Sequence, residues 1–185
     1  MPRNFFIYII LVALLVVSWR LMLLSEPTLS DRAAVPEHSP DYFSRGYSKV
    51  EMDVNGKPKN RIVADKVMHF SDNDTSELER PVMTLYKPDA APWIIRSETG
   101  TVPAGGRDLY LNGKVNIHRK QMANYKTIII NTSNLHVKPE QEYAETNAWT
   151  ELIMPPNRTT GIGMQANFGG PLLIKLLADV RGKYE

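Results

Sequence analysis

From residue 42 to residue 170, apolar side chains alternate with polar ones in short runs, and no long amphipathic helix interrupts them. The clearest run is Leu109–Ile117, in which the apolar side chains occupy alternate positions on either side of Gly113. A repeat of two places all the apolar side chains on one face of a β-strand. Pro, Gly and Asn bound the runs at regular intervals, a pattern typical of an all-β sandwich, barrel or open roll.

Two local patterns refine this prediction. Asn55-Gly56 separates two alternating runs, and because both residues tolerate positive φ, the pair predicts a hairpin closed by a tight primed turn. A short stretch of small or polar residues followed by a β run also recurs at intervals of 31 to 35 residues, beginning near Ala64, Ser97, Thr132 and Gly163. Such a period indicates stacked hairpin units. Chance spacing in an all-β chain remains the alternative.

The last segment, Pro171–Glu185, fits two structures. Five of its apolar residues lie on one face of a helix, whereas Leu172, Ile174 and Leu176 alternate as in a strand. If it is a strand, it is the last one of the sheet. Its outer edge would then present unpaired N–H and C=O groups on which another β protein can dock.

The N-terminal stretch Phe5–Leu24 is almost continuously apolar. About 20 residues at 1.5 Å each form a helix about 30 Å long, which matches the hydrocarbon core of a bilayer. A cleaved signal peptide is the alternative, but Ser18–Leu24 lacks the small residues that cleavage requires. The sequence therefore predicts an uncleaved anchor over residues 1–24, a Pro-containing linker over 25–41 and a folded body over 42–185.

Arg3 precedes the apolar stretch, so the charge bias favours a cytoplasmic N-terminus and an exported body. Arg20 lies about one turn from the far end of the helix. It either extends to the lipid headgroups or contacts the transmembrane helices of a partner.

The charges outside this stretch are balanced. Of 22 basic and 20 acidic residues, only Arg3 and Arg20 precede Ser25, so the body carries 20 of each sign. A balanced body argues against nucleic acid, which requires clustered Lys and Arg. The chain also has no cysteine, which excludes disulfides, thiolate metal sites and thiol nucleophiles.

Little in the body suggests catalysis. The four histidines are scattered, and Asp72–Glu77 begins like a calcium loop but lacks its turn glycine and its closing Glu. Phosphate loops, nucleophile elbows and dinucleotide fingerprints are missing. Glu77 and Glu79 share a strand face, so an enzyme acting on polysaccharide remains an alternative. We expect no catalytic residue, no metal and no cofactor.

Several runs are apolar on both faces, as in Ile62–Ala64, Trp93–Ile95 and Ile128–Ile130. One explanation is an ordinary two-layer core, as in a purely structural, membrane-anchored adaptor. The other is a roll whose inner face stays open as an apolar groove for an acyl chain.

The order and spacing of these features resemble the LptC family of lipopolysaccharide export proteins over nearly the whole chain. The resemblance rests on the N-terminal anchor, the linker and a series of motifs. These are Asn55-Gly56, Ile62–Val67, Glu79–Val82, Trp93 with Ser97, Leu109–Ile117 and Thr159–Gly161. The Leu-x-Leu-x-Gly-x-Val-x-Ile stretch is the most specific of them.

The resemblance implies an open, twisted β-jellyroll in the periplasm, anchored in the inner membrane, whose interior holds the acyl chains of lipopolysaccharide. It implies as partners the extractor made of LptB, LptF and LptG, and the periplasmic protein LptA at the C-terminal edge. It places Gly56 and Gly161 on glycines of the family pattern, which turn geometry or a neighbour's close approach would explain. The inward members of the alternations are the candidate groove lining: Val50, Met52, Ile62, Met68, Leu78, Leu109, Leu111, Val115, Ile117, Ile128 and Ile130.

Overall fold

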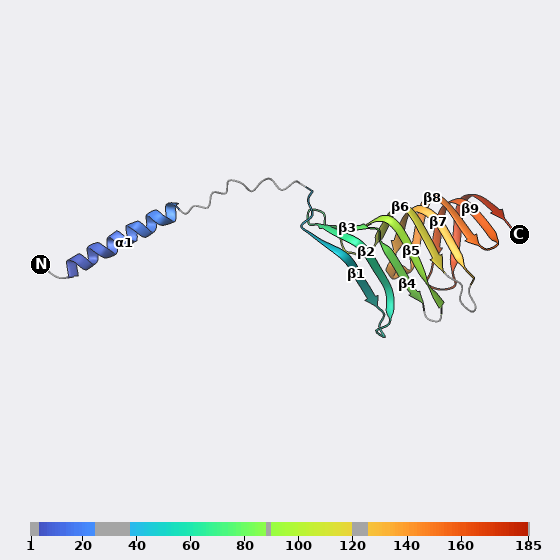
Figure 1. Cartoon of the computed structure of the whole chain (residues 1–185), viewed down its shortest axis with the longest axis horizontal. Coiled ribbons are helices and arrows are strands. Elements are labelled where there is room, and N and C mark those ends of the chain that lie inside the picture. Colours follow the sequence, from blue (N-terminus) through green and yellow to red (C-terminus); the bar gives the residue numbers. More distant parts are fainter. Residues whose placement is uncertain (1–3, 25–37, 88–89, 120–125, 185) are drawn as a thin grey trace. The chain divides into compact units, whose positions relative to one another are not determined.

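The computed structural model describes residues 4–24, 38–87, 90–119 and 126–184 (Figure 1). These residues fall into two units, an N-terminal helix and a β body that begins at His38. Most of the predicted linker, residues 25–37, lies outside the described residues.

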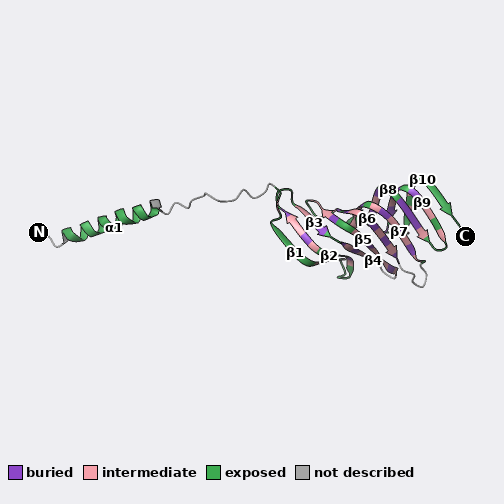
Figure 2. Cartoon of the chain, turned by 45° about the horizontal axis from the view of Figure 1, so that its top comes forward, coloured by how far each residue is buried: buried purple, intermediate pink, exposed green. Residues whose placement is uncertain are grey.

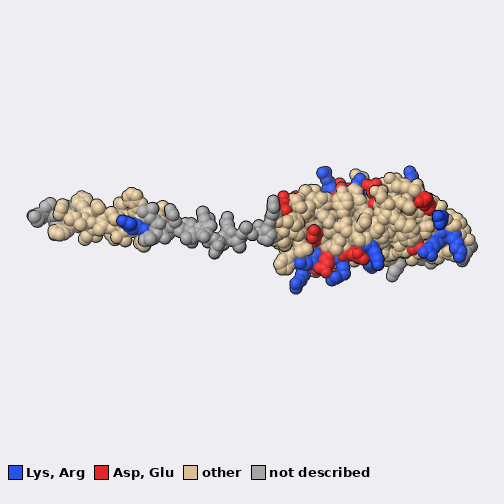
Figure 3. Space-filling model, turned by 90° about the horizontal axis from the view of Figure 1, so that it is seen from above, with Lys and Arg blue, Asp and Glu red and all other residues tan. Residues whose placement is uncertain are grey.

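The helix α1 (Asn4–Leu24) coincides with the predicted anchor. Its stretch Phe5–Met22 is long and apolar enough to cross a membrane, and none of it is buried against protein. The surface of the helix is almost entirely free of charge, whereas acidic and basic side chains are interspersed over the body (Figure 3). A helix that is apolar on every side is stable where lipid surrounds it.

Within the described ranges, the body is one antiparallel sheet of ten strands with a single 3-10 turn, η1 (Pro139–Gln141), which confirms the all-β prediction. The last segment is a strand rather than a helix. The strands are β1 (Tyr42–Met52), β2 (Pro58–Phe70), β3 (Thr75–Glu79), β4 (Val82–Lys87), β5 (Ala90–Val102), β6 (Leu109–Arg119), β7 (Ile128–Lys138), β8 (Tyr143–Met154), β9 (Asn157–Asn167) and β10 (Leu173–Lys183).

Apart from β3 and β4, strands that are adjacent in sequence are neighbours in the sheet, which runs from β1 at one end to β10 at the other. β3 and β4 are two halves of one interrupted strand, since both pair with β2 on one side and β5 on the other. The break lies at Arg80, which has a positive φ of 47°, and the buried Pro81. Their backbones remain tied to β5, where Arg80 N donates to Glu98 O and Ser97 N donates to Pro81 O.

A line of β-bulges crosses the sheet at this level, and we call it the crease. Register shifts fall between Ser97 and Thr99 in β5, between Leu111 and Lys114 in β6, and at equivalent positions in β7, β8 and β10. Several residues along the crease have positive φ: Gly46, Arg80, Gly113, Asn134, Gly163 and Asp179. Because each bulge bends its strand, the aligned bulges bend the whole sheet. The four starting points of the predicted repeat all fall at or next to this line.

Small polar side chains satisfy backbone groups that the crease removes from the ladder. Thr146 Oγ1 donates to Ser133 O at 2.8 Å, and Thr132 Oγ1 donates to Trp149 O at 3.1 Å. Asn134 Oδ1 accepts the N–H of Gly113 at 3.1 Å. Since unpaired buried backbone groups are costly, these hydroxyl and amide groups explain why the recurring stretches are polar.

The crease divides the sheet into two arms that enclose the core. The first arm contains β3 and Leu109–Leu111, and the second contains β4 and Val115–Arg119. One apolar cluster draws on both, with Leu109 and Leu111 from the first and Val115 and Ile117 from the second. Figure 2 shows that burial is concentrated in the middle strands, while β1 and β10 are mostly exposed. The body is therefore an open roll with a filled middle and two exposed terminal strands.

Candidate functional site: an apolar interior between two arms

Eight of the eleven candidate groove residues lie in the interior. Ile62 is half-buried and packs against the core. The other seven are buried members of the core: Leu78, Leu109, Leu111, Val115, Ile117, Ile128 and Ile130. They come from both arms, so the interior is lined by aliphatic side chains on facing walls.

The other three candidates were assigned to the wrong face. Val50 and Met52 are 41% and 54% exposed. Val50 is paired with the exposed Arg61, whereas its neighbour Lys49 is paired with the inward Ile62. β1 is an edge strand with apolar residues on both faces, and its inward positions change from even to odd numbers across Gly46, whose φ is positive, without a shift of register against β2. The inner face of β1 carries Tyr47 and Lys49 instead.

The assignment of Met68 to the groove lining is wrong for a similar reason. Its neighbour Val67 is buried and paired with the buried Leu78, while Met68 is paired with the exposed Phe43 and Glu77. In β2 the buried positions change from even to odd numbers between Ala64 and Val67. The crease crosses β2 at this point. Counting every second residue from Ala64 across the crease therefore reaches the outward Met68 instead of the inward Val67.

The interior opens beside β1. A cavity of about 170 Å³ there is lined largely by Tyr47, Ile62, Val67, Leu78, Val102 and Leu109. Lys49, Ser44 and Asp108 also line it and supply polar groups. Desolvation raises the pKa of the Tyr47 phenol above its ordinary value, so this group stays neutral. Further inside, Ile95, Ile117 and Ile130 are fully buried and the space is filled.

Opposite the crease, the rims of the two arms meet along a line that we call the seam. The indole of Trp93 from the second arm packs on Phe168, which follows the first-arm end of β9. Close by, Lys87 at the end of β4 forms an ion pair with Glu142 just before β8, and its ammonium group also donates to Gly169 O at 3.3 Å. The Arg119 guanidinium lies over the Trp93 ring at 4.7 Å. A hollow of about 660 Å³, lined in part by Arg119, Phe168 and Leu172, adjoins these contacts.

The alternation pattern did not single out the seam. Lys87, Glu142 and Phe168 lie at strand ends, and nothing local indicates that residues 55 positions apart form a pair. Phe168 directly follows β9, but its edge-to-face contact with Trp93 depends on how the arms close.

The two family glycines have different explanations. Gly56 has φ of 74° and open space where a Cβ would lie, so turn geometry alone accounts for it. The predicted hairpin is confirmed, but Asn55 does not have positive φ, and the loop closes through a hydrogen bond from Asp53 N to Lys57 O. For Gly161 the turn explanation is wrong. It lies within β9, where a Cβ would come 3.1 Å from Leu176 Cβ and Ala178 O.

The alternative chemistries find little support in the residues that the structure describes. There, no three His, Asp or Glu side chains gather as metal ligands. Asp72–Asp74 lie in the turn between β2 and β3, as expected of a polar hairpin loop. Glu77 and Glu79 are exposed on β3, and neither lines the interior cavity. Arg20 lies in the last turns of α1.

A helix long and apolar enough to cross a membrane and a body that forms an open roll with an aliphatic interior define the class as a β-jellyroll protein with an N-terminal apolar helix. The family model described as "Lipopolysaccharide-assembly, LptC-related" matches residues 10–185. The chain belongs to this family, and its role is in lipopolysaccharide transport.

Two further comparisons accompany this match. Among solved structures, the chain is similar to LptH from Pseudomonas aeruginosa, described as the LptA homologous periplasmic component of the conserved lipopolysaccharide transport device. The identity is 11% and the TM-score 0.49, over 68% of this chain and 94% of that one. No curated protein matches the sequence.

Proposed function

We propose that the interior between the arms holds the acyl chains of lipopolysaccharide on their way across the periplasm. In this proposal α1 anchors the chain in the inner membrane with its N-terminus in the cytoplasm. The body receives lipid from the LptB, LptF and LptG extractor and passes it to LptA. The protein acts as a conduit rather than as an enzyme, and directionality comes from ATP hydrolysis in the extractor.

The aliphatic interior that opens beside β1 is the observation that carries this proposal. An acyl chain leaves a bilayer without a large penalty only if another apolar surface replaces the bilayer, at about 0.8 kcal/mol per CH₂. The cavity at β1 supplies the first such surface. Because the middle is filled, the arms must separate at the seam before a chain moves further in.

Photo-reactive amino acids test the proposal by comparing facing and outward neighbours. We expect lipopolysaccharide to be crosslinked in cells from Tyr47 and Ile62 at the open end, and from Leu111 and Val115 once the arms separate. The matched outward positions Val50 and Arg61 lie on the same strands and should label weakly.

Equal labelling from inner and outer positions would overturn the groove. Crosslinking from Tyr47 and Ile62 without Leu111 and Val115 would confine lipid to the open end and contradict passage through the interior. A complete lack of crosslinks at all four inner positions would leave the body as a structural adaptor.

The free edge of β10 is the proposed docking site for LptA. Among the strands that the structure describes, β10 pairs only with β9, so its other edge offers backbone groups that no described strand pairs with. Removing residues 171–185 should abolish LptA binding while extractor binding persists. If LptA still binds the truncated chain, the docking edge is elsewhere.

A further inference from the structure

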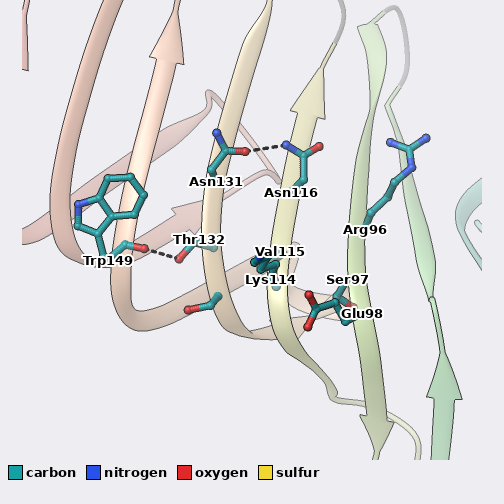
Figure 4. A pocket seen from close by; sticks show the side chains of 10 residues that line it. Arg96, Ser97, Glu98, Lys114, Val115, Asn116, Asn131, Thr132 and Trp149 are labelled. Carbon is teal, nitrogen blue, oxygen red and sulfur yellow. Dashed lines mark hydrogen bonds between the residues drawn. The ribbon is translucent and has the colours of Figure 1, made fainter.

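A second hollow lies on the outer face of the body. It measures about 600 Å³ and lies beside the crease on the second arm. Asn116 lines it and alternates with Val115 and Ile117, whose side chains are in the core, so its own side chain points to the opposite face (Figure 4). The hollow is therefore separated from the interior by the sheet itself.

One row of its polar side chains is fixed by a ladder of hydrogen bonds across neighbouring strands. Asn116 Nδ2 donates to Asn131 Oδ1, and Asn131 Nδ2 donates to Glu151 Oε2, each at 2.8 Å. Glu151 in turn forms an ion pair with Arg158. Each amide has a second N–H, and Asn116 has its carbonyl oxygen, beyond these bonds. The ladder therefore presents donors and an acceptor in fixed positions.

The second row, nearer the crease, combines an aromatic ring with charged and hydroxyl groups. Trp149 is 53% exposed, although it lies on a central strand next to the buried Thr150. The Thr132 hydroxyl donates a hydrogen bond to the backbone carbonyl oxygen of Trp149 at 3.1 Å. Glu98 and Lys114 lie in the same row (Figure 4), and Ser133, which also lines the hollow, is paired with Lys114. A large indole that contributes little to the core and lies beside polar groups is typical of a ligand or partner surface.

The charges of the hollow are mixed. Arg96 and Lys114 are basic and Glu98 is acidic, while Arg158 offsets Glu151. A phosphate site would require clustered cations without a carboxylate, and an acyl chain would require aliphatic walls. Interleaved donors and acceptors beside a flat ring match a molecule with several hydroxyls and an apolar ring face. A pyranose sugar has this chemistry, because its C–H face packs on an indole while its hydroxyls meet amides and carboxylates.

We propose that this outer hollow binds a saccharide, with Trp149 as the stacking platform and Asn116, Asn131 and Glu98 as hydrogen-bonding groups. The volume lies within the range of small-molecule sites, about 300 to 1,000 Å³. The site is separate from the interior and does not depend on the lipid function proposed above. Two sources share this chemistry, the sugars of lipopolysaccharide and the glycan strands of a cell wall.

The test uses the full chain in detergent micelles that contain no sugar. Two probes are titrated separately: lipid-free oligosaccharide released from lipopolysaccharide, and the tetramer of N-acetylglucosamine as a glycan analogue. NMR follows the indole N–H of Trp149, with the buried Trp93 as an internal reference. We expect at least one probe to shift Trp149 and not Trp93.

Variants then locate the binding, and isothermal titration calorimetry measures their affinities because Trp149→Ala and Trp149→Phe remove the indole signal. Trp149→Ala should weaken binding by about tenfold or more, and Trp149→Phe should recover most of it because a flat ring remains. Asn131→Ala should weaken binding by breaking the ladder. Tyr42→Ala removes a half-exposed aromatic from β1 and serves as the matched control.

Each outcome of these experiments either supports or overturns the saccharide site. A response to only one probe supports the site and identifies the source, and a response to both supports it for the shared chemistry. A lack of response to either probe at about 10 mM, well above a millimolar Kd, would overturn the proposal. So would unchanged binding by Trp149→Ala. Neither result depends on whether lipid enters the interior.

Discussion

The rings of Trp93 and Phe168 meet edge to face across the seam, with centroids 5.1 Å apart and planes inclined by 63°. One ring belongs to each arm, and both side chains are almost fully buried. Their contact therefore holds the two rims together on the side of the roll opposite the crease. Any process that places a ligand in the middle of the interior must break it.

Phe168→Ala should lower the free energy of unfolding by about 3 to 5 kcal/mol, because it removes a buried ring and leaves a cavity. It should also increase hydrogen exchange in β5 near Trp93, since the seam loosens there first. Denaturant unfolding followed by tryptophan fluorescence measures the first effect. Leu173→Ala, at a half-exposed position on β10, is the control and should change stability by under about 0.5 kcal/mol. Equal effects of the two substitutions would contradict the seam contact.

The ion pair between Lys87 and Glu142 lies in a mostly buried part of the seam, with 19% and 24% of the side chains exposed. Lys87→Met or Glu142→Gln alone should lower stability by about 1 to 3 kcal/mol, because each leaves one partly buried charge without its counter-charge. The swapped variant Lys87→Glu with Glu142→Lys should recover part of the loss. A double-mutant cycle on unfolding free energies measures the coupling. A coupling near zero would show that the pair does not help to hold the rims together.

The start of β1 is tied to the turn between β2 and β3 through His69. Its Nδ1 lies 2.8 Å from Asp41 Oδ1 and its Nε2 lies 3.1 Å from Asp74 Oδ1. The hydrogen bond with Asp41, followed by the one with Asp74, raises the pKa of His69 above its ordinary 6.5. The same contact with His69 lowers the pKa of Asp41 below its ordinary 3.8.

These directions fix the pH dependence of the tie. The folded state binds the His69 proton more tightly than the unfolded state, so this contribution is full below pH 6.5 and is lost as pH rises through the folded pKa. The Asp41 contribution is present above pH 3.8 and is lost as pH falls through its lowered pKa. The protection factor against hydrogen exchange, which is the intrinsic exchange rate divided by the observed rate, should therefore be highest at the start of β1 between these values. His69→Gln should flatten the fall of this protection factor above pH 6.5, and an unchanged pH profile of protection would refute the tie.

Gly161 tests close packing between β9 and β10. Gly161→Ala should cost about 1 to 3 kcal/mol, because the new Cβ would lie 3.1 Å from Leu176 Cβ and Ala178 O. Hydrogen exchange should rise in β10 before it rises in β8. The matched control is Gly170→Ala, where open space surrounds the added atom and φ is not positive. If both variants behave alike, close approach does not explain Gly161.

The sequence was sufficient to predict the strands and the aliphatic interior because both depend on local alternation. Leu109, Leu111, Val115 and Ile117 kept their parity through the crease at Gly113, so counting by two succeeded there. It failed for Met68, because β2 changes parity between Ala64 and Val67, and for Val50, because a solvated edge strand allows apolar residues to face outward. The contacts at the seam could not be predicted from the sequence, for another reason. The pairs Lys87 with Glu142 and Trp93 with Phe168 are set by how the arms close, and no local pattern encodes that.

The crease also protects the sheet from misfolding. Ten alternating strands of similar character could slip past one another by two residues without moving any apolar side chain to the wrong face. The bulges prevent this, because residues such as Gly113 and Asn134 hold positive φ at fixed places and Asn134 accepts the N–H of Gly113 from the next strand. A slipped pairing would set each bulge against a regular stretch of its neighbour and break that hydrogen bond. Aligned irregularities thus give a repetitive sequence a single permitted pairing.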